Sequence, residues 1–318
     1  MLVYHKRSLE IQTFKVNKMI VVKLMGGLGN QMFQYAYAMS LAKEYDEDII
    51  IDSSFYRDEK RIALDVFQIG NHENWTTAIN EKERVRVTKA QKKYRILQKA
   101  KRVLLRTEEL GESWFKRNVQ KGYYFNFDPY YYRFIKTDQN NKYIYGYFQS
   151  EKYFSNCSDL IKKTFQLSVP LSENAVGILD EINNSNSVAL HIRLGDYKKL
   201  RNFYLDVCTP EYYKKALDLV IKRIANPKIF VFTNDISGVR QVLSLPQESV
   251  IVDNTKDYED FELIRNCKHV ILSNSSFSWW ASYLNQNENK LLIGPTPWFS
   301  TLKKQSDIYT SNIIKIQV

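Results

Sequence analysis

Short apolar runs alternate with amphipathic stretches along most of this chain. Residues 19–25 form an apolar run rich in β-branched side chains, which predicts a buried parallel strand. The glycine-rich segment 26–29 interrupts this run, and residues 30–45 then place apolar side chains at helical spacing. Residues 48–52 predict the next strand. This strand–loop–helix–strand order is how an α/β fold begins.

The alternation becomes regular after residue 186. Apolar runs predict strands at 187–192, 228–233, 249–252, 269–273 and 290–294. The segments between them predict helices at 210–225, 257–267 and 277–285. Thr209-Pro210 and Asn254-Thr255 are typical helix-start signals. Strands that alternate with helices imply a mostly parallel sheet covered on both faces.

The middle of the chain is harder to assign. Residues 80–110 look helical and basic, and residues 121–150 are crowded with Tyr, Phe, Asn and Asp. Pro170 and the polar stretch 183–187 are typical of a hinge. The fold class that we predict is α/β, with two Rossmann-like domains facing a cleft. The predicted segments are an N-terminal extension, an N-terminal domain, a C-terminal domain and a C-terminal segment, with bounds at 1–18, 19–182, 183–300 and 301–318.

Positive charge is concentrated in one segment. The chain of 318 residues has a net charge of +11, and residues 82–106 hold eleven Lys or Arg against one Glu. A solvated helix face is one interpretation, and contact with anionic lipid, nucleic acid or a phosphorylated substrate is another. Apolar side chains in the segment are compatible with a helix on a membrane surface, and they are Val85, Val87, Ile96, Leu97, Val103 and Leu104.

The remaining composition indicates a globular protein of a reducing compartment. Apolar residues make up 44% of the chain, enough for a sizeable core. Cysteines stand at 157, 208 and 267 without metal-ligand or disulfide spacing, so we expect reduced thiols. Residues 1–18 lack the apolar region of a secretory signal, and no run approaches the length of a membrane span. We therefore expect a cytoplasmic location, with peripheral attachment to the inner membrane as an option.

The first motif that carries chemistry is the segment 26–31, Gly-Gly-Leu-Gly-Asn-Gln, between a predicted strand and helix. Glycines let the backbone approach an anion, and the N-terminus of the next helix presents N–H groups and partial positive charge. A tight turn that needs positive φ is the alternative explanation.

The second motif is the segment 191–197, His-Ile-Arg-Leu-Gly-Asp-Tyr, directly after a predicted strand. Residues just beyond the carboxyl end of a parallel strand line the ligand crevice of an α/β fold. Arg193 can hold a phosphate through two N–H donors. An ion pair between Arg193 and Asp196 that only fixes the loop is the structural alternative.

The third motif extends from Asp260 to Trp280 and contains a helix, a strand, a hydroxyl-rich loop and another helix. Its serines can cap the second helix or hold a phosphate at its N-terminus. We expect Trp279 and Trp280 to pack that helix against the sheet. A fourth element ends a strand in Thr233-Asn234-Asp235, with an Asx turn as the simpler explanation.

Together these motifs resemble the α1,2-fucosyltransferases of glycosyltransferase family 11, in their bacterial form. GGLGNQMFQYA at 26–36 resembles the N-terminal motif of the family, HIRLGDY at 191–197 its HxRxGDY motif, and CKHVILSNSSFSWW at 267–280 its C-terminal signature. The resemblance covers about Met19 to about Phe299, and the combination in this order is specific. The family is similar, more distantly, to α1,6- and protein O-fucosyltransferases.

The resemblance implies two Rossmann-like domains of the GT-B kind and GDP-β-L-fucose as donor substrate. It implies inversion at the anomeric carbon, no cofactor and no required metal. The product would be an α1,2 linkage on the 2-hydroxyl of a galactose-terminated glycan, in surface polysaccharide or oligosaccharide synthesis. That acceptor is lipid-linked in one version of the hypothesis. A GDP-sugar transferase of another linkage or sugar is the alternative within enzymes.

Carried over by position, the resemblance assigns roles to individual residues. Arg193 would hold the β-phosphate, His191 and Asp260 would meet the guanosine, and Asp235 would support the nucleotide loop. Ser275 and Ser276 would contact the diphosphate, and Gly27 and Gly29 would face it from the other domain. Asn30 and Asn274 complete the predicted donor-binding residues. The 19–182 domain would then be the acceptor side and the 183–300 domain the GDP-fucose side.

The chain departs from many relatives at one position, because Leu194 stands where they carry a second arginine. A second cation on the diphosphate, if needed, must come from elsewhere. Arg193 and Asp196 are the predicted catalytic pair. Asp196 is the nearest candidate for the general base by motif position, with His72 and Glu73 as weaker ones.

Two other kinds of site, a metal site and a nucleic-acid surface, fit the sequence less well. Asp46-Glu47-Asp48 has the spacing of a metal-binding DxD sequence, but it lies between a predicted helix and strand, where we expect it to be solvated. The basic segment suggests a nucleotide- or RNA-binding protein as the alternative class. It lacks the interleaved aromatics of a stacking platform, so we predict no nucleic-acid partner.

Overall fold

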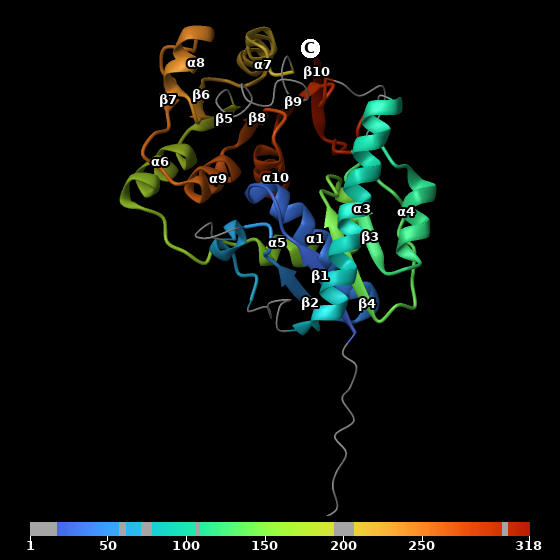
Figure 1. Cartoon of the computed structure of the whole chain (residues 1–318). Coiled ribbons are helices and arrows are strands. Elements are labelled where there is room, and N and C mark those ends of the chain that lie inside the picture. Colours follow the sequence, from blue (N-terminus) through green and yellow to red (C-terminus); the bar gives the residue numbers. More distant parts are fainter. Residues whose placement is uncertain (1–17, 57–61, 71–77, 106–108, 194–206, 301–304) are drawn as a thin grey trace, which may run out of the picture.

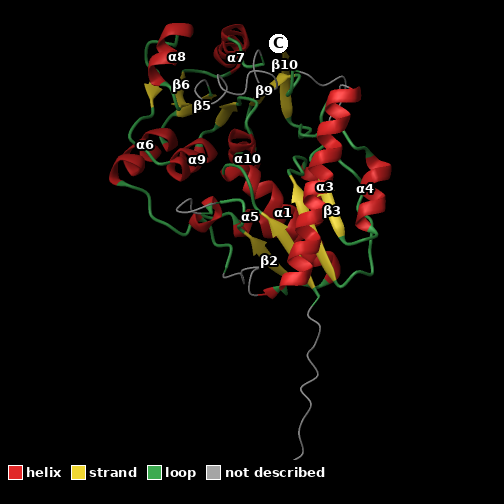
Figure 2. Cartoon of the chain, in the orientation of Figure 1, coloured by secondary structure: helices red, strands yellow, loops and turns green. Residues whose placement is uncertain are grey.

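The computed structural model of the chain describes residues 18–56, 62–70, 78–105, 109–193, 207–300 and 305–318. Within them, two parallel sheets are covered by helices (Figures 1 and 2). The predicted α/β class, with parallel strands, is confirmed. Within the same described residues, no helix is both long and apolar enough to cross a membrane.

The first sheet has four parallel strands in the order β2-β1-β4-β3. Its strands are β1 (Met19–Lys23), β2 (Asp48–Asp52), β3 (Tyr123–Asn126) and β4 (Asn141–Gly146). The helices of this half are α1 (Leu28–Tyr45), α3 (Glu81–Leu105), α4 (Glu112–Val119) and α5 (Ser158–Thr164), with short 3-10 turns η1 (Ala63–Val66), η2 (Glu151–Tyr153) and η3 (Ser155–Cys157).

The second sheet has six parallel strands in the order β10-β9-β8-β5-β6-β7. Its strands are β5 (Asn186–Ile192), β6 (Pro227–Thr233), β7 (Val250–Ile251), β8 (His269–Ile271), β9 (Leu292–Thr296) and β10 (Ile313–Gln317). Its helices are α6 (Glu173–Asn183), α7 (Pro210–Arg223), α8 (Ile236–Val242), α9 (Asp257–Asn266) and α10 (Ser276–Leu284). Thr209 caps α7 as predicted, whereas α9 begins after Lys256, two residues beyond Asn254.

The two halves meet where α1 packs against α10 (Figure 1). The ring of Phe33 on α1 lies 4.6 Å from that of Trp279 and 5.0 Å from that of Trp280, centroid to centroid. Phe154 stacks on Trp280 at 5.2 Å. Both tryptophans are buried, as predicted, but they join one helix to another across the halves and one core cluster contains residues of both.

Three strands were not foreseen from the sequence. β3 and β4 occupy the aromatic-rich stretch 121–150, and β10 lies in the C-terminal segment, paired in parallel with β9. Tyr123 and Phe125 carry their rings on one face of β3, where they stack at a centroid distance of 5.1 Å. The aromatic density of the stretch therefore reflects a core and not an exposed stacking surface.

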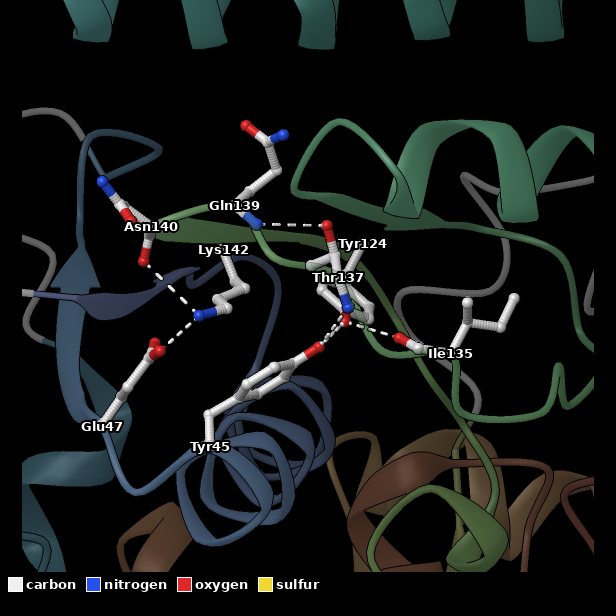
Figure 3. Close-up of polar contacts among 8 residues, drawn as sticks. All are labelled: Tyr45, Glu47, Tyr124, Ile135, Thr137, Gln139, Asn140 and Lys142. Carbon is white, nitrogen blue, oxygen red and sulfur yellow. Dashed lines mark hydrogen bonds and ion pairs between the residues drawn. The ribbon is translucent and has the colours of Figure 1, made fainter.

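The expectation that Asp46-Glu47-Asp48 is solvated is wrong for its central residue. Asp46 and Asp48 are exposed, but the carboxylate of Glu47 is 5% exposed and forms an ion pair with Lys142, itself 2% exposed (Figure 3). The ammonium group also lies 4.1 Å from the ring centroid of Tyr45. The hydroxyl of Tyr45 accepts a hydrogen bond from the backbone N–H of Thr137 and contacts Tyr124. This network joins β4 to the end of α1.

We predict that Lys142→Ala lowers the free energy of unfolding by about 3–5 kcal/mol, because it leaves the Glu47 carboxylate buried without its cation. Urea unfolding followed by far-ultraviolet circular dichroism measures the loss. The matched control is the double variant Lys142→Met with Glu47→Leu, which removes both charges and should recover most of the stability. Equal losses in both variants would contradict a role for the charge pair.

Candidate functional site

A pocket of about 240 Å³ lies at the junction of the two halves. Its walls come from six places: the starts of α1, α9 and α10, and the segments after β4, β5 and β9. The lining residues are Gly27, Leu28, Gly29, Asn30, Gln149, Arg193, Asp257, Asn274, Ser275, Ser276, Phe277, Trp298 and Phe299. Seven of the predicted donor-binding positions are among them.

The first wall is the N-terminus of α1. Gly27 is the N-cap residue with φ of −82°, and no side chain caps this helix. The first turn of α1 carries no acidic residue, so its partial positive charge is not neutralised locally. Asn30 follows one turn into the site, and its Oδ1 accepts hydrogen bonds from Gln149 Nε2 at 2.9 Å and Ser276 Oγ at 3.1 Å. Asn30 therefore joins α1 to the segment after β4 and to the start of α10.

The second wall is the N-terminus of α10. Ser275 is its N-cap residue, and its Oγ accepts from the backbone N–H of Phe277 at 3.3 Å. The first turn of α10 also lacks an acidic residue. Asn274 precedes the cap and donates from Nδ2 to the backbone oxygen of Trp298 at 3.2 Å, which fixes the loop. The pocket thus has the positive ends of two helices, one from each half.

The two helix starts approach very closely at Gly29. A Cβ atom built on Gly29 would lie 2.4 Å from the backbone carbon of Ser276 and 2.6 Å from the backbone nitrogen of Phe277. Only a hydrogen fits in this space, so the residue is glycine for reasons of contact and not of backbone angle. Gly27 differs, because a Cβ there would meet no atom within 4 Å.

Arg193 and His191 both come from the C-terminal end of strand β5. Arg193 directly follows β5 and lines the pocket, so it adds a guanidinium group to the two helix N-termini. His191 is the penultimate residue of β5 and does not line the pocket. Its Nδ1 shares a hydrogen bond of 2.8 Å with Ser273 Oγ. Burial lowers the pKa of His191 to about 3, with a further contribution from the charge of Arg193, so the ring is neutral.

Two predicted carboxylates, Asp260 and Asp235, are not among the residues that line the pocket. Asp260 lies one turn into α9 and contacts the hydroxyl of Thr255, and burial raises the pKa of Asp260 to about 6. Asp235 is the N-cap residue of α8, where its Oδ1 accepts from the backbone N–H of Gly238 at 2.9 Å. Asp196, the predicted base, lies outside the described residues, as do His72, Glu73 and Leu194.

Sequence reasoning missed two polar residues of the pocket. Gln149 comes from the segment after β4, and Asp257 is the first residue of α9, one turn before Asp260. Both follow a strand of a parallel sheet, which is the position where ligand-binding residues gather. That signal was available for Asp257, because α9 was predicted. It was hidden for Gln149, because β4 was not.

The pocket is suited to an anionic ligand, such as a diphosphate that carries a polar group at each end. The positive end of each helix is equivalent to roughly half an elementary charge. Arg193 adds a full charge and can form paired hydrogen bonds with phosphate oxygens. Within the described part of the chain, no group of three His, Cys, Asp or Glu side chains is placed to hold a metal ion. The three cysteines are free, as expected.

Comparisons with known proteins agree with these features. The sequence model of glycosyl transferase family 11 matches residues 19–317. The O-antigen biosynthesis glycosyltransferase WbnK of Escherichia coli is 29% identical over 297 residues, which are 87% of this chain and 94% of that protein. An alpha-1,2-colitosyltransferase of Escherichia coli is 27% identical over 291 residues, or 88% and 92% of the two chains. The resemblance noted in the motifs is confirmed at the level of the family.

The fold has a counterpart among solved structures. The crystal structure of the NodZ alpha-1,6-fucosyltransferase soaked with GDP-fucose superposes with a TM-score of 0.51. The alignment covers 84% of this chain and 92% of that chain at 14% sequence identity. At this identity the likeness concerns the fold alone.

We predict that Gly29→Ala lowers both the melting temperature and the affinity for GDP. Alanine normally favours a helix by about 1 kcal/mol over glycine. Here the added methyl group meets the backbone of α10 and must separate the two helix starts, at a cost of about 1–3 kcal/mol. Differential scanning fluorimetry and calorimetric titration with GDP measure the two effects.

Gly27→Ala is the matched control and should keep the melting temperature of the wild type. An unchanged or raised melting temperature in Gly29→Ala would show that α1 and α10 are not held in contact.

Proposed function

Because the chain belongs to glycosyltransferase family 11, we propose that it transfers L-fucose from GDP-β-L-fucose to the 2-hydroxyl of a galactose residue in a glycan. The observation that carries the proposal is the junction pocket, where two helix N-termini from different halves meet Arg193. A sugar nucleotide has its diphosphate between the base and the sugar. Binding that diphosphate at the junction directs the sugar toward one half and the nucleoside toward the other.

The diphosphate is the group on which the reaction depends. When the bond between C1 of fucose and the phosphate oxygen breaks, GDP leaves with the electron pair and negative charge grows on the β-phosphate. Donors fixed in advance around that position stabilise the charge without reorganisation. In our proposal Arg193 binds the β-phosphate, and the backbone N–H groups at the starts of α1 and α10 bind the remaining oxygens. Ser275 and Ser276 add hydroxyl donors.

This set of donors makes a metal ion unnecessary in the proposed mechanism. Arg193 and two helix N-termini together supply roughly two positive charges, comparable to a divalent cation beside the diphosphate. We therefore propose that the reaction requires neither a metal nor another cofactor.

The acceptor hydroxyl attacks C1 from the face opposite the departing diphosphate, so the configuration inverts. The new bond joins the galactose 2-oxygen to C1, and the hydroxyl proton passes to a carboxylate. The transition state at C1 resembles an oxocarbenium ion. Asp257 lines the pocket and is exposed, and we add it to Asp196 as a candidate base. A base must reach the hydroxyl in the bound complex, and this criterion favours a residue on the pocket wall.

The guanine base is assigned to the C-terminal half. In the proposal the carboxylate of Asp260 accepts hydrogen bonds from the N–H groups of guanine, and this needs its ionised form. His191 is neutral, so in the proposal it acts through Ser273, two residues after β8, and supports the loop that leads to α10. Asp235 supports the nucleotide loop by capping α8.

Colitose is the strongest alternative sugar. One similar protein carries the name alpha-1,2-colitosyltransferase, and that name supports the 1,2 linkage while leaving the sugar open. Colitose is L-fucose without the 3-hydroxyl group. A site that hydrogen-bonds a hydroxyl can reject the analogue that lacks it by a factor of about 10⁴ or more, so the two donors are readily distinguished.

The deciding experiment offers the metal-stripped protein GDP-fucose or GDP-colitose with a panel of galactose-terminated oligosaccharides. We expect transfer of fucose, an α1,2 linkage by nuclear magnetic resonance, and equal rates with and without EDTA. Exclusive use of GDP-colitose would replace the donor in the proposal. Loss of activity in EDTA with rescue by Mn²⁺ or Mg²⁺ would remove the metal-independent mechanism.

We predict that Arg193→Ala abolishes measurable transfer and weakens GDP binding by about 10- to 150-fold, the equivalent of a charged hydrogen bond of about 1.5–3 kcal/mol. The rate falls further than the affinity, because the charge on the leaving group grows in the transition state. Arg193→Lys should not restore the rate, since lysine lacks the planar pair of donors. Arg223→Ala, at the exposed end of α7, is the control. Normal turnover in Arg193→Ala would make the motif structural.

We predict that Asp260→Asn stabilises the ligand-free protein and weakens GDP binding. Because burial raises the pKa of Asp260 to about 6, the folded protein holds this proton more tightly than the unfolded chain does. Its contribution to stability is therefore present at low pH and is lost as the pH rises through about 6. The variant removes this loss above pH 6, so its melting temperature should exceed that of the wild type there.

The wild-type affinity for GDP should also fall as the pH drops below about 6, and the Asp260→Asn variant should lose this dependence. Calorimetric titrations across the range, beside scanning fluorimetry, measure both effects. Asp218→Asn, an exposed carboxylate on α7, is the matched control. If Asp260→Asn binds GDP as tightly as the wild type near pH 7.5, the guanine contact is assigned to the wrong residue.

A further inference from the structure

Helix α3 has two faces of opposite character. Val87, Gln91, Tyr94 and Gln98 recur at helical spacing and are buried, so they form the face that packs on the first sheet. A second row recurs at the same spacing on the other side of the helix and is exposed along its whole length. We call this row the outer stripe, and it consists of Val85, Lys89, Lys92, Ile96, Lys99 and Val103. At 3.6 residues per turn the two rows lie about 150° apart.

The outer stripe is unusual because it exposes aliphatic side chains. Among the described residues, twelve large hydrophobic side chains are exposed, and six of them belong to α3. Ile96 is 67% exposed, Val103 72% and Leu104 78%. An ordinary solvated helix carries polar residues at such positions. These side chains gain free energy only when an apolar medium or partner covers them.

The charges around these aliphatic side chains indicate what kind of partner covers them. Helix α3 carries ten Lys or Arg, and its two acidic residues, Glu81 and Glu83, both lie in the first turn. From Arg84 to Leu105 every charged residue is basic. Two copies of this face would repel each other. RNA would meet the lysines, but it has no place for isoleucine and valine, and the helix's only aromatic ring, Tyr94, is buried.

The C-terminal end of α3 lies at the same edge of the first sheet as the pocket. Tyr94 Oη accepts from the backbone N–H of Phe127 at 3.0 Å, and the Arg95 guanidinium lies 4.6 Å from the centroid of the Phe127 ring. Phe127 directly follows the last residue of β3, so α3 reaches the carboxyl edge of the sheet at this level. The residues after Arg95 extend about 15 Å farther at 1.5 Å each. Figure 1 shows α3 continuing past β3. The pocket lies at the same edge, since Gly27 follows β1.

We propose that the outer stripe of α3, with Leu104, docks the protein on the surface of an anionic lipid bilayer. The aliphatic side chains enter the boundary between headgroups and acyl chains, and the lysines extend to the lipid phosphates. Each Lys or Arg close to an anionic surface strengthens attachment by roughly 1 kcal/mol, or about five-fold. Docking this end of α3 holds the carboxyl edge of the first sheet near the membrane, where a lipid-linked acceptor glycan is anchored.

The test is co-sedimentation of the full chain with vesicles of phosphatidylcholine alone or mixed with phosphatidylglycerol, at low and high salt. We expect binding to the anionic vesicles only, weakened by salt because the Debye length falls from about 10 Å at 0.1 M to about 3 Å at 1 M. Replacing Lys89, Lys92 and Lys99 by Glu should lower the partition coefficient by at least about 100-fold, because three basic groups are lost and three acidic groups are added. The matched control reverses Lys215, Lys222 and Arg223 on α7, with the same change in net charge.

A second variant tests the aliphatic contribution without changing charge. Ile96→Ser with Leu104→Ser should reduce binding to anionic vesicles by about ten-fold or more, given roughly 25 cal/mol for each Å² of apolar surface buried. Both α3 variants should fold, with far-ultraviolet circular dichroism and melting temperatures near those of the wild type. Their transfer to a soluble acceptor should be unchanged.

Three results would overturn the proposal: equal binding to neutral and anionic vesicles, equal losses in the α3 and α7 variants, or loss of RNA retention on a filter in the α3 variant with vesicle binding intact. Vesicle binding needs no donor substrate. The docking proposal can therefore fail while the proposed transfer reaction stands, and the reverse is also true.

Discussion

The close approach of α1 and α10 at Gly29 is the contact on which the rest of the site depends. It brings the first turn of one half within van der Waals distance of the backbone of the other, and a single methyl group would prevent it. Phe33, Trp279 and Trp280 hold the two helices together by aromatic packing just behind this point. Because the two halves also share one core, their relative position follows from packing and not from a flexible linker.

Bringing two helix N-termini together has an electrostatic cost, because their positive ends repel each other. Both ends are positive, neither first turn holds an acidic residue, and Arg193 adds a third positive group. The aromatic packing of Phe33 on Trp279 and Trp280 holds the two helix starts together against this repulsion. An anion bound in the pocket would remove the repulsion, and this is why we propose that the junction binds the phosphate groups of the donor. The hydrogen bonds of Asn30 with Gln149 and Ser276 fix the position of the α1 start relative to the α10 start.

Periodicity and family motifs predicted the second half well, because its strands are continuous apolar runs between helices with clear start signals. Thr209 and Ser275, for example, are N-caps where hydroxyl residues were expected. The aromatic stretch before residue 150 was not assigned, since its strands alternate Tyr and Phe on both faces and resemble a loop in composition. The sequence could indicate that Gly29 belongs to a motif, but not that it touches Ser276, because that contact spans 247 positions and depends on the packing of both halves. The burial of Glu47 was unpredictable for the same reason, as its partner Lys142 lies on a strand that was not foreseen.

The charged residues of the chain divide into those that the fold buries and those that it leaves exposed, and the difference follows from whether a partner is fixed nearby. The side chain of Glu47 can be buried because the ammonium group of Lys142 lies beside it and compensates its charge. Asp260 is half-buried beside the hydroxyl of Thr255, and the loss of water around it raises its pKa. In our proposal this carboxylate accepts hydrogen bonds from guanine. The lysines of α3 have the opposite arrangement: they are exposed, alike in sign and mixed with aliphatic side chains. Burial of charge without compensation is costly, and so is exposure of apolar surface, so each marks a place where the isolated chain is incomplete. In our two proposals, a nucleotide fills the junction pocket and the headgroup region of an anionic bilayer covers the outer stripe of α3.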